Sequence, residues 1–177
     1  MTPAEEEATR VVREKPEDYE MFSTRPVPIR PFDPDSKRAA LAYGARLNER
    51  LASTGVAAEL HGSLALELAG KGEWEFALYL SPDRWYPTLT LLANHLPSVY
   101  FMSEELVTFN DECDGHHVEV IAMRGEAAAR NRAIMRHWRE HPEARADYAA
   151  QKYRHCHSRR EYYRWKDNYI ADILESL

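Results

Sequence analysis

A glycine-serine turn followed by two closely spaced acids constrains this chain more than any other feature. Gly62 and Ser63 are separated by nine residues from Glu73 and Glu75, which lie in an otherwise apolar run. Successive side chains of a β-strand point to opposite faces, so a spacing of two places both carboxylates on the same face. Two acids side by side on a strand, with a backbone turn next to them, form a cradle that suits a divalent cation and a phosphate chain.

The acids belong to a segment whose side chains alternate between apolar and polar. From Trp74 to Leu80 every second residue is large and apolar, which predicts a strand with one buried face. Similar patterns predict further strands at residues 57–61, 99–102, 106–109 and 117–123, with a turn at 111–115. Helical spacing of apolar residues predicts a helix that Asp33 or Asp35 caps and that ends at residues 53–55. It also predicts helices at residues 64–69 and 83–96, and two or three helices after residue 125. This order indicates an α+β fold, a small mixed sheet flanked by helices.

A third acid lies on the last predicted strand. Glu119 stands between Val118 and Val120, and it joins the first two acids if its strand pairs next to theirs. Three converging carboxylates repel one another unless a cation lies among them. Mg²⁺ prefers oxygen ligands and is commonly shared with substrate phosphates, where it orients an attacking hydroxyl and stabilises a leaving pyrophosphate.

The length and composition suit one domain with a helical appendage. The chain has 177 residues, of which 44% are apolar, enough for a hydrophobic core. We expect an N-terminal extension at residues 1–24, where a short helix is able to start at Thr2. A core at 25–124 follows, which opens with a proline-rich, extended lead-in, and then a helical region at 125–177 that packs on the core.

Charge is spread unevenly along the chain. The net charge is −6, but residues 124–166 carry 12 Lys and Arg against 5 Asp and Glu, a balance of +7 that leaves −13 for the remainder. This asymmetry suggests an anionic ligand held between basic and acidic regions. Charge alone favours the simpler interpretation, a solvated helical surface rich in arginine.

The cysteines and the apolar runs indicate the cellular compartment in which we expect the protein. Cys113 and Cys156 do not form a disulfide framework, which favours a reducing environment. No run approaches the roughly 18 apolar residues of a membrane span, and the N-terminus lacks the apolar stretch of a signal peptide. We therefore expect a cytoplasmic protein that does not enter a membrane.

Taken together, these motifs resemble a known superfamily. Gly62-Ser63, Glu73-Trp74-Glu75-Phe76 and Val118-Glu119-Val120 resemble the signature of the nucleotidyltransferases related to DNA polymerase beta. More narrowly, the chain resembles the GrpB family from about residue 27 to the C-terminus. The matching segments are residues 29–34, 61–63, 69–73, 141–145, 147–152 and 163–170.

The resemblance implies a nucleotidyltransferase fold that uses Mg²⁺ and a nucleoside triphosphate, expected to be ATP. It implies that Glu73, Glu75 and Glu119 are the metal-binding and catalytic acids. Ser63, next to Gly62, would hold the terminal phosphates, and cations would face the triphosphate. The candidate cations are Lys71, Lys152 and Lys166. The acceptor of the nucleotidyl group, a small molecule or a macromolecule, is not implied.

An alternative role arises from the identity of the acids. The superfamily favours Asp at the first two acid positions, where this chain has Glu73 and Glu75. The additional methylene moves each carboxylate by roughly a bond length, and Mg²⁺ demands tight geometry at about 2.0–2.1 Å. The alternative is therefore a catalytically degenerate module on the same fold that binds a nucleotide or a partner.

Two further interpretations are weaker. Cys113 and His116 have a spacing suited to zinc. The second cluster, His-Cys-His at residues 155–157, is too tightly spaced for a usual pair of zinc ligands. Histidines that lie on the surface or that order the pocket are therefore favoured over a zinc site. Alternating aromatic and basic residues at 162–166 are able to stack on nucleic-acid bases. The apolar period of that segment favours core packing, so nucleic acid is a possible partner but not the expected one.

Overall fold

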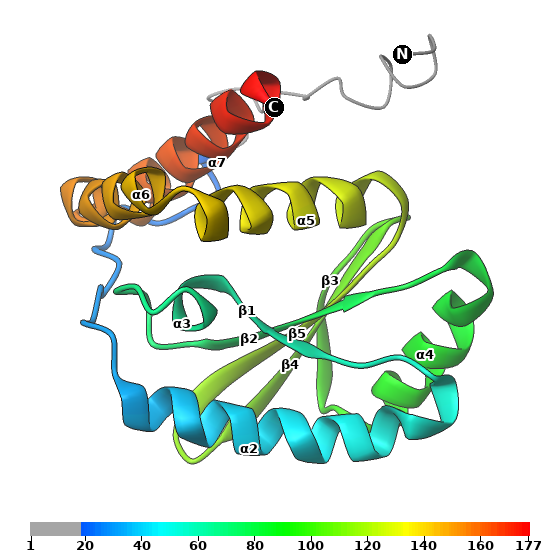
Figure 1. Ribbon diagram of the computed structural model, residues 1–177. Coiled ribbons are helices and arrows are strands. Elements are labelled where there is room, and N and C mark those ends of the chain that lie inside the picture. The colour runs from blue at the N-terminus through cyan, green and yellow to red at the C-terminus, as the bar shows by residue number, and fades with distance from the viewer. Residues whose placement is uncertain (1–18) are drawn as a thin grey trace, which may run out of the picture. The chain divides into compact units, whose positions relative to one another are not determined.

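The computed structural model describes residues 19–177 (Figure 1). The expected helix at Thr2 lies outside these residues. The described chain forms two compact units, one made of residues 30–131 and the other of residues 19–29 together with 132–177. We call them the sheet unit and the helical unit.

Within the described residues, the sheet unit contains one mixed sheet of five strands. The strands are β1 (Glu59–His61), β2 (Trp74–Tyr79), β3 (Ser98–Met102), β4 (Leu106–Cys113) and β5 (His116–Met123). Their order is β1-β2-β5-β4-β3, with β2 and β5 parallel and the other neighbours antiparallel. The α+β class and the mixed sheet are as the sequence predicts.

The helices of the sheet unit begin and end at recognisable residues. They are α2 (Pro34–Leu51), continued by the short 3₁₀ helix η2 (Ala52–Thr54), then α3 (Gly62–Ala65) and α4 (Pro82–His95). The Asp33 carboxylate accepts a hydrogen bond from the Asp35 backbone N–H, and Pro34 occupies the first turn. Figure 1 shows α2 and α4 on the same side of the sheet.

The hydrophobic core fills the space between these two helices and the sheet. The strand residues that face it alternate with those that do not, as period-two patterning requires. The buried strand residues of this core are Trp74, Phe76, Leu78, Val107, Phe109, Val118, Val120 and Ala122. From α2, Tyr43 packs against the rings of Trp74 and Phe76, and its hydroxyl donates to Asp111 at 2.7 Å. Burial is the main reason that the pKa of Tyr43 lies well above its ordinary value, and the hydrogen bond to Asp111 adds to it.

The β4–β5 hairpin is longer than the sequence predicts. The predicted strand end at residue 109 and turn at 111–115 were wrong, because β4 continues to Cys113, which pairs with His116. Only Asp114 and Gly115 form the turn, with φ angles of 51° and 75°. Positive φ at both central residues matches the right-handed twist of the flanking strands, which is why Asp-Gly makes a two-residue hairpin.

The short helix after the glycine-serine turn also differs from its prediction. The sequence predicts one or two helical turns over residues 64–69. The structure has a single turn, α3, which begins at Gly62 and ends at Ala65. Glu67 then adopts a positive φ of 59°, a left-handed conformation that stops a helix.

The helical unit is built around stacked aromatic rings. Its helices are α5 (Gly125–Glu140), whose first turns belong to the sheet unit, α6 (Pro142–His155) and α7 (Arg159–Ser176). Tyr148 of α6 stacks against Trp138 of α5, with ring centroids 4.3 Å apart, and lies near Trp165 and Tyr169 of α7. Leu177, which follows the end of α7, is 64% exposed.

An extended segment before the sheet unit belongs with these helices. The backbone N–H of Val27 donates to the carbonyl of Cys156, and Arg159 donates to the carbonyl of Arg25, both at 2.7 Å. The Tyr19 hydroxyl donates to Asp167 at 3.0 Å. Among the described residues, no helix is both long enough and apolar enough to cross a bilayer.

The close approach of α2 to β2 yields a first prediction. A methyl group added at Gly44 would lie 2.8 Å from the buried ring of Phe76. Alanine is better than glycine in a helix by about 1 kcal/mol. Forcing a methyl group into a packed core costs about 1–3 kcal/mol. We expect Gly44→Ala to lower the free energy of unfolding, measured by urea denaturation followed by circular dichroism.

Ala45 on the exposed side of the same helix provides the control. Ala45→Gly should lose only the helix propensity, about 1 kcal/mol, because nothing is packed against it. A Gly44→Ala protein that is more stable than the wild type would show that α2 does not press on Phe76.

Candidate functional site

The register of the sheet brings the predicted acids together. In the parallel pair of β2 and β5, Glu75 lies directly opposite Glu119. Both point away from the hydrophobic core, because their neighbours on either side along the strand are core residues. On the antiparallel flanks, His61 of β1 is paired with Glu75, and Asn110 of β4 is paired with Glu119. A polar row therefore crosses four adjacent strands in the order His61, Glu75, Glu119, Asn110.

The third acid comes from the residue just before β2. Carboxylate oxygens of Glu73, Glu75 and Glu119, one from each, all lie within 4.8 Å of one another. Oxygen ligands of one Mg²⁺ ion lie about 2.1 Å from it, and so at most about 4.2 Å from each other. Small side-chain rotations are enough to reach that spacing. The three acids singled out from the sequence thus form one cluster on the sheet.

Electrostatic repulsion within the cluster shows in Glu119. Its pKa lies above the ordinary value, first because the side chain is buried and then because Glu75 is close; Lys71 acts in the opposite direction. The Nζ atom of Lys71 is 2.5 Å from Oε2 of Glu73, and Nε2 of His117 is 3.5 Å from Oε1 of Glu119. The like charges of Glu75 and Glu119 repel each other, so the cluster favours the arrival of additional positive charge.

The glycine-serine turn lies directly against the acids, as the sequence predicts. Gly62 has a φ of +64°, and a methyl group there would lie 1.6 Å from Oε2 of Glu75. The position therefore needs glycine for both its backbone conformation and its closeness to the carboxylate. The chain after the turn folds back on Ser63: the backbone N–H of Leu68 donates to the carbonyl of Ser63, and Gly70 packs against the Ser63 side chain.

A hydrogen-bonded group beside the acids was not found from the sequence. The Nδ2 atom of Asn131 lies 3.2 Å from Nε2 of His61, and Oδ1 of Asn131 accepts from the Tyr79 hydroxyl at 2.7 Å. His61 is buried and Asn131 lies on α5. A lone Asn in an Arg-rich helix carries no signal of such a role. Only the packing of the first turns of α5 on the sheet reveals it.

The other two predicted lysines belong to the helical unit. Lys152 is wholly buried on α6, where its Nζ lies 4.4 Å from the centroid of the Tyr148 ring. Lys166 is partly buried on α7. Lys71 is thus the predicted phosphate-binding lysine that shares the unit of the acids.

The structure does not form the zinc site that the Cys113 and His116 spacing suggests. The Cys113 thiol donates to Asp114 and accepts from Arg46, while His116 stacks on Trp74 with ring centroids 4.5 Å apart. In the part of the chain that the structure describes, the three glutamates are the only group of three or more potential metal ligands that converge.

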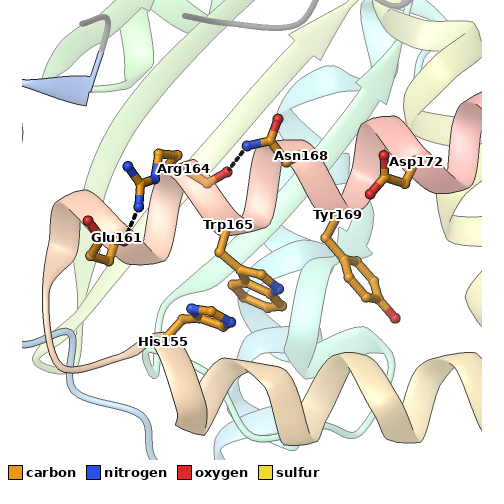
Figure 2. Close-up of a pocket in the computed structure, with 7 residues that line it drawn as sticks. All are labelled: His155, Glu161, Arg164, Trp165, Asn168, Tyr169 and Asp172. Atoms are coloured by element: carbon orange, nitrogen blue, oxygen red, sulfur yellow. Dashed lines mark hydrogen bonds and ion pairs between the residues drawn. The ribbon is translucent and has the colours of Figure 1, made fainter. Parts of the chain in front are cut away.

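A hollow lies in the helical unit, along α7 beside the end of α6 (Figure 2). Its volume is about 320 Å³. Its aromatic walls are already engaged: the rings of Trp165 and His155 stack at 5.0 Å, and Tyr169 donates to Asp147. The neighbouring Tyr162 is buried. The rings of the aromatic and basic segment at residues 162–166 are therefore engaged in packing, as the apolar period of that segment predicts.

Comparison with models of known protein families gave no match, and comparison with curated proteins gave none either.

The contact between Gly62 and Glu75 yields a second prediction. Replacing glycine by alanine at positive φ costs about 1–2 kcal/mol by backbone strain alone. At Gly62 the methyl group must also displace the Glu75 carboxylate. We expect Gly62→Ala to lower the melting temperature more than strain alone explains.

Gly115 supplies a matched control, because its φ is +75° and a methyl group there would meet no atom within 4 Å. Gly115→Ala measures the strain by itself. Equal melting temperatures for the two variants would contradict the close approach of Gly62 to the acids.

The raised pKa of Glu119 yields a third prediction. A carboxyl whose folded pKa exceeds its unfolded value destabilises the protein once it is ionised. The penalty is absent below the unfolded pKa, about 4.3, and complete above the folded one. Without divalent cations, Glu119→Gln should therefore be more stable than the wild type at pH 7, and this difference should vanish as the pH falls below about 4.

Glu112, exposed on β4, serves as the control for removal of a sheet carboxylate. Thermal unfolding of Glu112→Gln should follow the wild type at each pH. A loss of stability in Glu119→Gln at pH 7 would refute the repulsion that we assign to the acid cluster.

Proposed function

We propose that this protein is a GrpB-like nucleotidyltransferase, which transfers a nucleotidyl group from a nucleoside triphosphate with Mg²⁺, expected to be ATP, to an acceptor. The observation that carries the proposal is the convergence of Glu73, Glu75 and Glu119 beside the turn at Gly62. Glu73 and Glu75 come from one segment and Glu119 from another, and the pairing of Glu75 with Glu119 across β2 and β5 supports a shared site.

The residues of the cluster suit a divalent cation. Oε2 of Glu73 is buried and forms an ion pair with Nζ of Lys71 at 2.5 Å. Three carboxylates within reach of one another are the hard, anionic ligands that Mg²⁺ prefers. Glu73, Glu75 and Glu119 would hold the metal. When bound, Mg²⁺ neutralises phosphate charge and stabilises the leaving pyrophosphate.

The turn and its neighbouring lysine would bind the phosphates. The backbone at Gly62 lies against Glu75, Ser63 follows it directly, and the short loop back to Lys71 packs on the Ser63 side chain through Gly70. Lysine is a compact point charge suited to a phosphate chain. Lys152 and Lys166 stay candidates for the same role on the strength of the resemblance.

Glu119 is the acid best suited to receive a proton. It lies one strand beyond Glu75, on the side of the cluster away from the turn at Gly62 that would hold the phosphates. In the transfer, the acceptor oxygen forms a bond to the α-phosphorus, and the bond from that phosphorus to the pyrophosphate oxygen breaks. The proton of the acceptor hydroxyl moves to the Glu119 carboxylate.

One observation favours a second candidate, a module that binds a nucleotide without turnover. The side chains of Glu73 and Glu75 are longer than the Asp residues of the superfamily, and Glu73 already contacts Lys71 at 2.5 Å. A carboxylate held by a lysine is less available to a metal. This candidate keeps the binding site but lacks the tight geometry that transfer chemistry demands.

Titration calorimetry with MgATP and an assay for released pyrophosphate separate these candidates. For a transferase we expect binding heat and, with water taking the nucleotidyl group in place of the unknown acceptor, pyrophosphate release that depends on Mg²⁺. Glu75→Gln should lower that release by at least 100-fold, because it removes a charge from the metal-binding set.

The control Glu112→Gln should keep wild-type turnover, and the circular dichroism spectrum of Glu75→Gln should match the wild type. Heat without pyrophosphate favours the binding module. Absence of both, with each of the four ribonucleoside triphosphates, would sink the nucleotide proposal. Binding to RNA that weakens steeply with salt and survives loss of the glutamates would indicate a nucleic-acid binder instead.

A further inference from the structure

The polar row across the sheet has two unlike ends. At one end, His61 is engaged by Asn131, which in turn accepts from Tyr79. At the other end stands Asn110, opposite Glu119 on the antiparallel strand β4. The residue before it, Phe109, lies in the hydrophobic core, so Asn110 points to the face that carries the acids.

The side-chain amide of Asn110 has an oxygen that lacks a hydrogen-bond donor among the described residues. Its Oδ1 atom is buried and, in the described part of the chain, accepts no hydrogen bond. Burial of a carbonyl oxygen without a donor destabilises a protein, and a ligand that donates a hydrogen bond would remove that cost. No residue of the sheet unit donates a hydrogen bond to this oxygen. At the opposite end of the row, by contrast, His61 and Asn131 are hydrogen-bonded to each other.

We propose that Asn110 binds the acceptor and helps to select it, by accepting a hydrogen bond from a second hydroxyl or amino group next to the nucleophilic hydroxyl. The inference rests on the proposed function. The turn at Gly62 and Ser63 lies on the Glu75 side of the row, which assigns that side to the phosphates. The Asn110 side is then left for the acceptor.

The geometry limits the size of the acceptor group that is recognised. Residues directly opposite on antiparallel strands have Cα atoms about 4.5–5.5 Å apart. Glu119 and Asn110 are such a pair. Two polar groups on neighbouring carbon atoms are therefore able to meet both side chains at once. The acceptor class is a molecule with a vicinal diol or a vicinal amino alcohol.

The first test determines whether the Asn110 amide stabilises the fold or is instead available to bind a ligand. Asn110→Leu replaces it with an apolar side chain of similar size, and removing an unsatisfied polar group should raise the melting temperature of the ligand-free protein. Thr108→Val is the control, two residues along the same face and paired with Ile121 instead of Glu119. A lower melting temperature for Asn110→Leu would show a structural role and overturn the proposal.

The second test measures acceptor choice with three matched probes. Propan-1-ol, propane-1,2-diol and 2-aminopropan-1-ol share a primary hydroxyl, and only the last two carry a neighbouring donor. With MgATP, the wild type and Thr108→Val should use at least one of these two with a kcat/KM about tenfold or more above that for propan-1-ol. Asn110→Leu should lose this preference, whereas the control Thr108→Val should keep it.

The outcomes separate this proposal from the one on which it rests. The relative rates with the diol and the amino alcohol identify the donor that Asn110 prefers. A preference that persists in Asn110→Leu, or a wild type that treats all three alcohols alike, overturns the role of Asn110 and leaves the transferase standing. Absence of pyrophosphate release from the wild type and from Thr108→Val refutes the transferase itself, and the acceptor role with it.

Discussion

The parallel pairing of β2 with β5 is the interaction on which the rest of the molecule depends. On one face it brings Phe76 next to Val120 in the core, and on the other it brings Glu75 next to Glu119. A slip by one residue would turn the apolar set of one strand toward the solvent face, so burial enforces the register. The carboxylates are therefore held together by hydrophobic packing beneath them, and not by any attraction of their own.

This arrangement concentrates groups that lower stability. Glu119 is partly buried beside a like charge, and Oδ1 of Asn110 is buried without a donor among residues 19–177. Both lie on one face of the sheet, while the other face is an ordinary apolar core. Proteins accept unfavourable groups of this kind where a ligand later satisfies them. Their clustering supports a binding role for this face more strongly than any one of them does.

Much of the fold was predictable because local patterns and tertiary packing agree. The alternation from Trp74 to Tyr79 and the capping Asp33 each match the element that the structure contains. The hairpin was predicted too short because Asp111 and Glu112 are polar and so look like turn residues. In the structure Asp111 is hydrogen-bonded to Tyr43 and Glu112 is exposed, both compatible with a strand. The Asp114-Gly115 pair was the better signal for the turn.

The three glutamates and the glycine-serine turn were identified from the sequence by itself. Its alternation also determined that Glu75 lies on the face of its strand that points away from the core. These follow from spacing, because a period of two is a property of the extended backbone. Only the tertiary structure decided that Glu119 pairs with Glu75, that Asn131 engages His61, and that Asn110 completes the row. Strand order and helix packing join residues far apart in the chain, and no local pattern records which strands become neighbours.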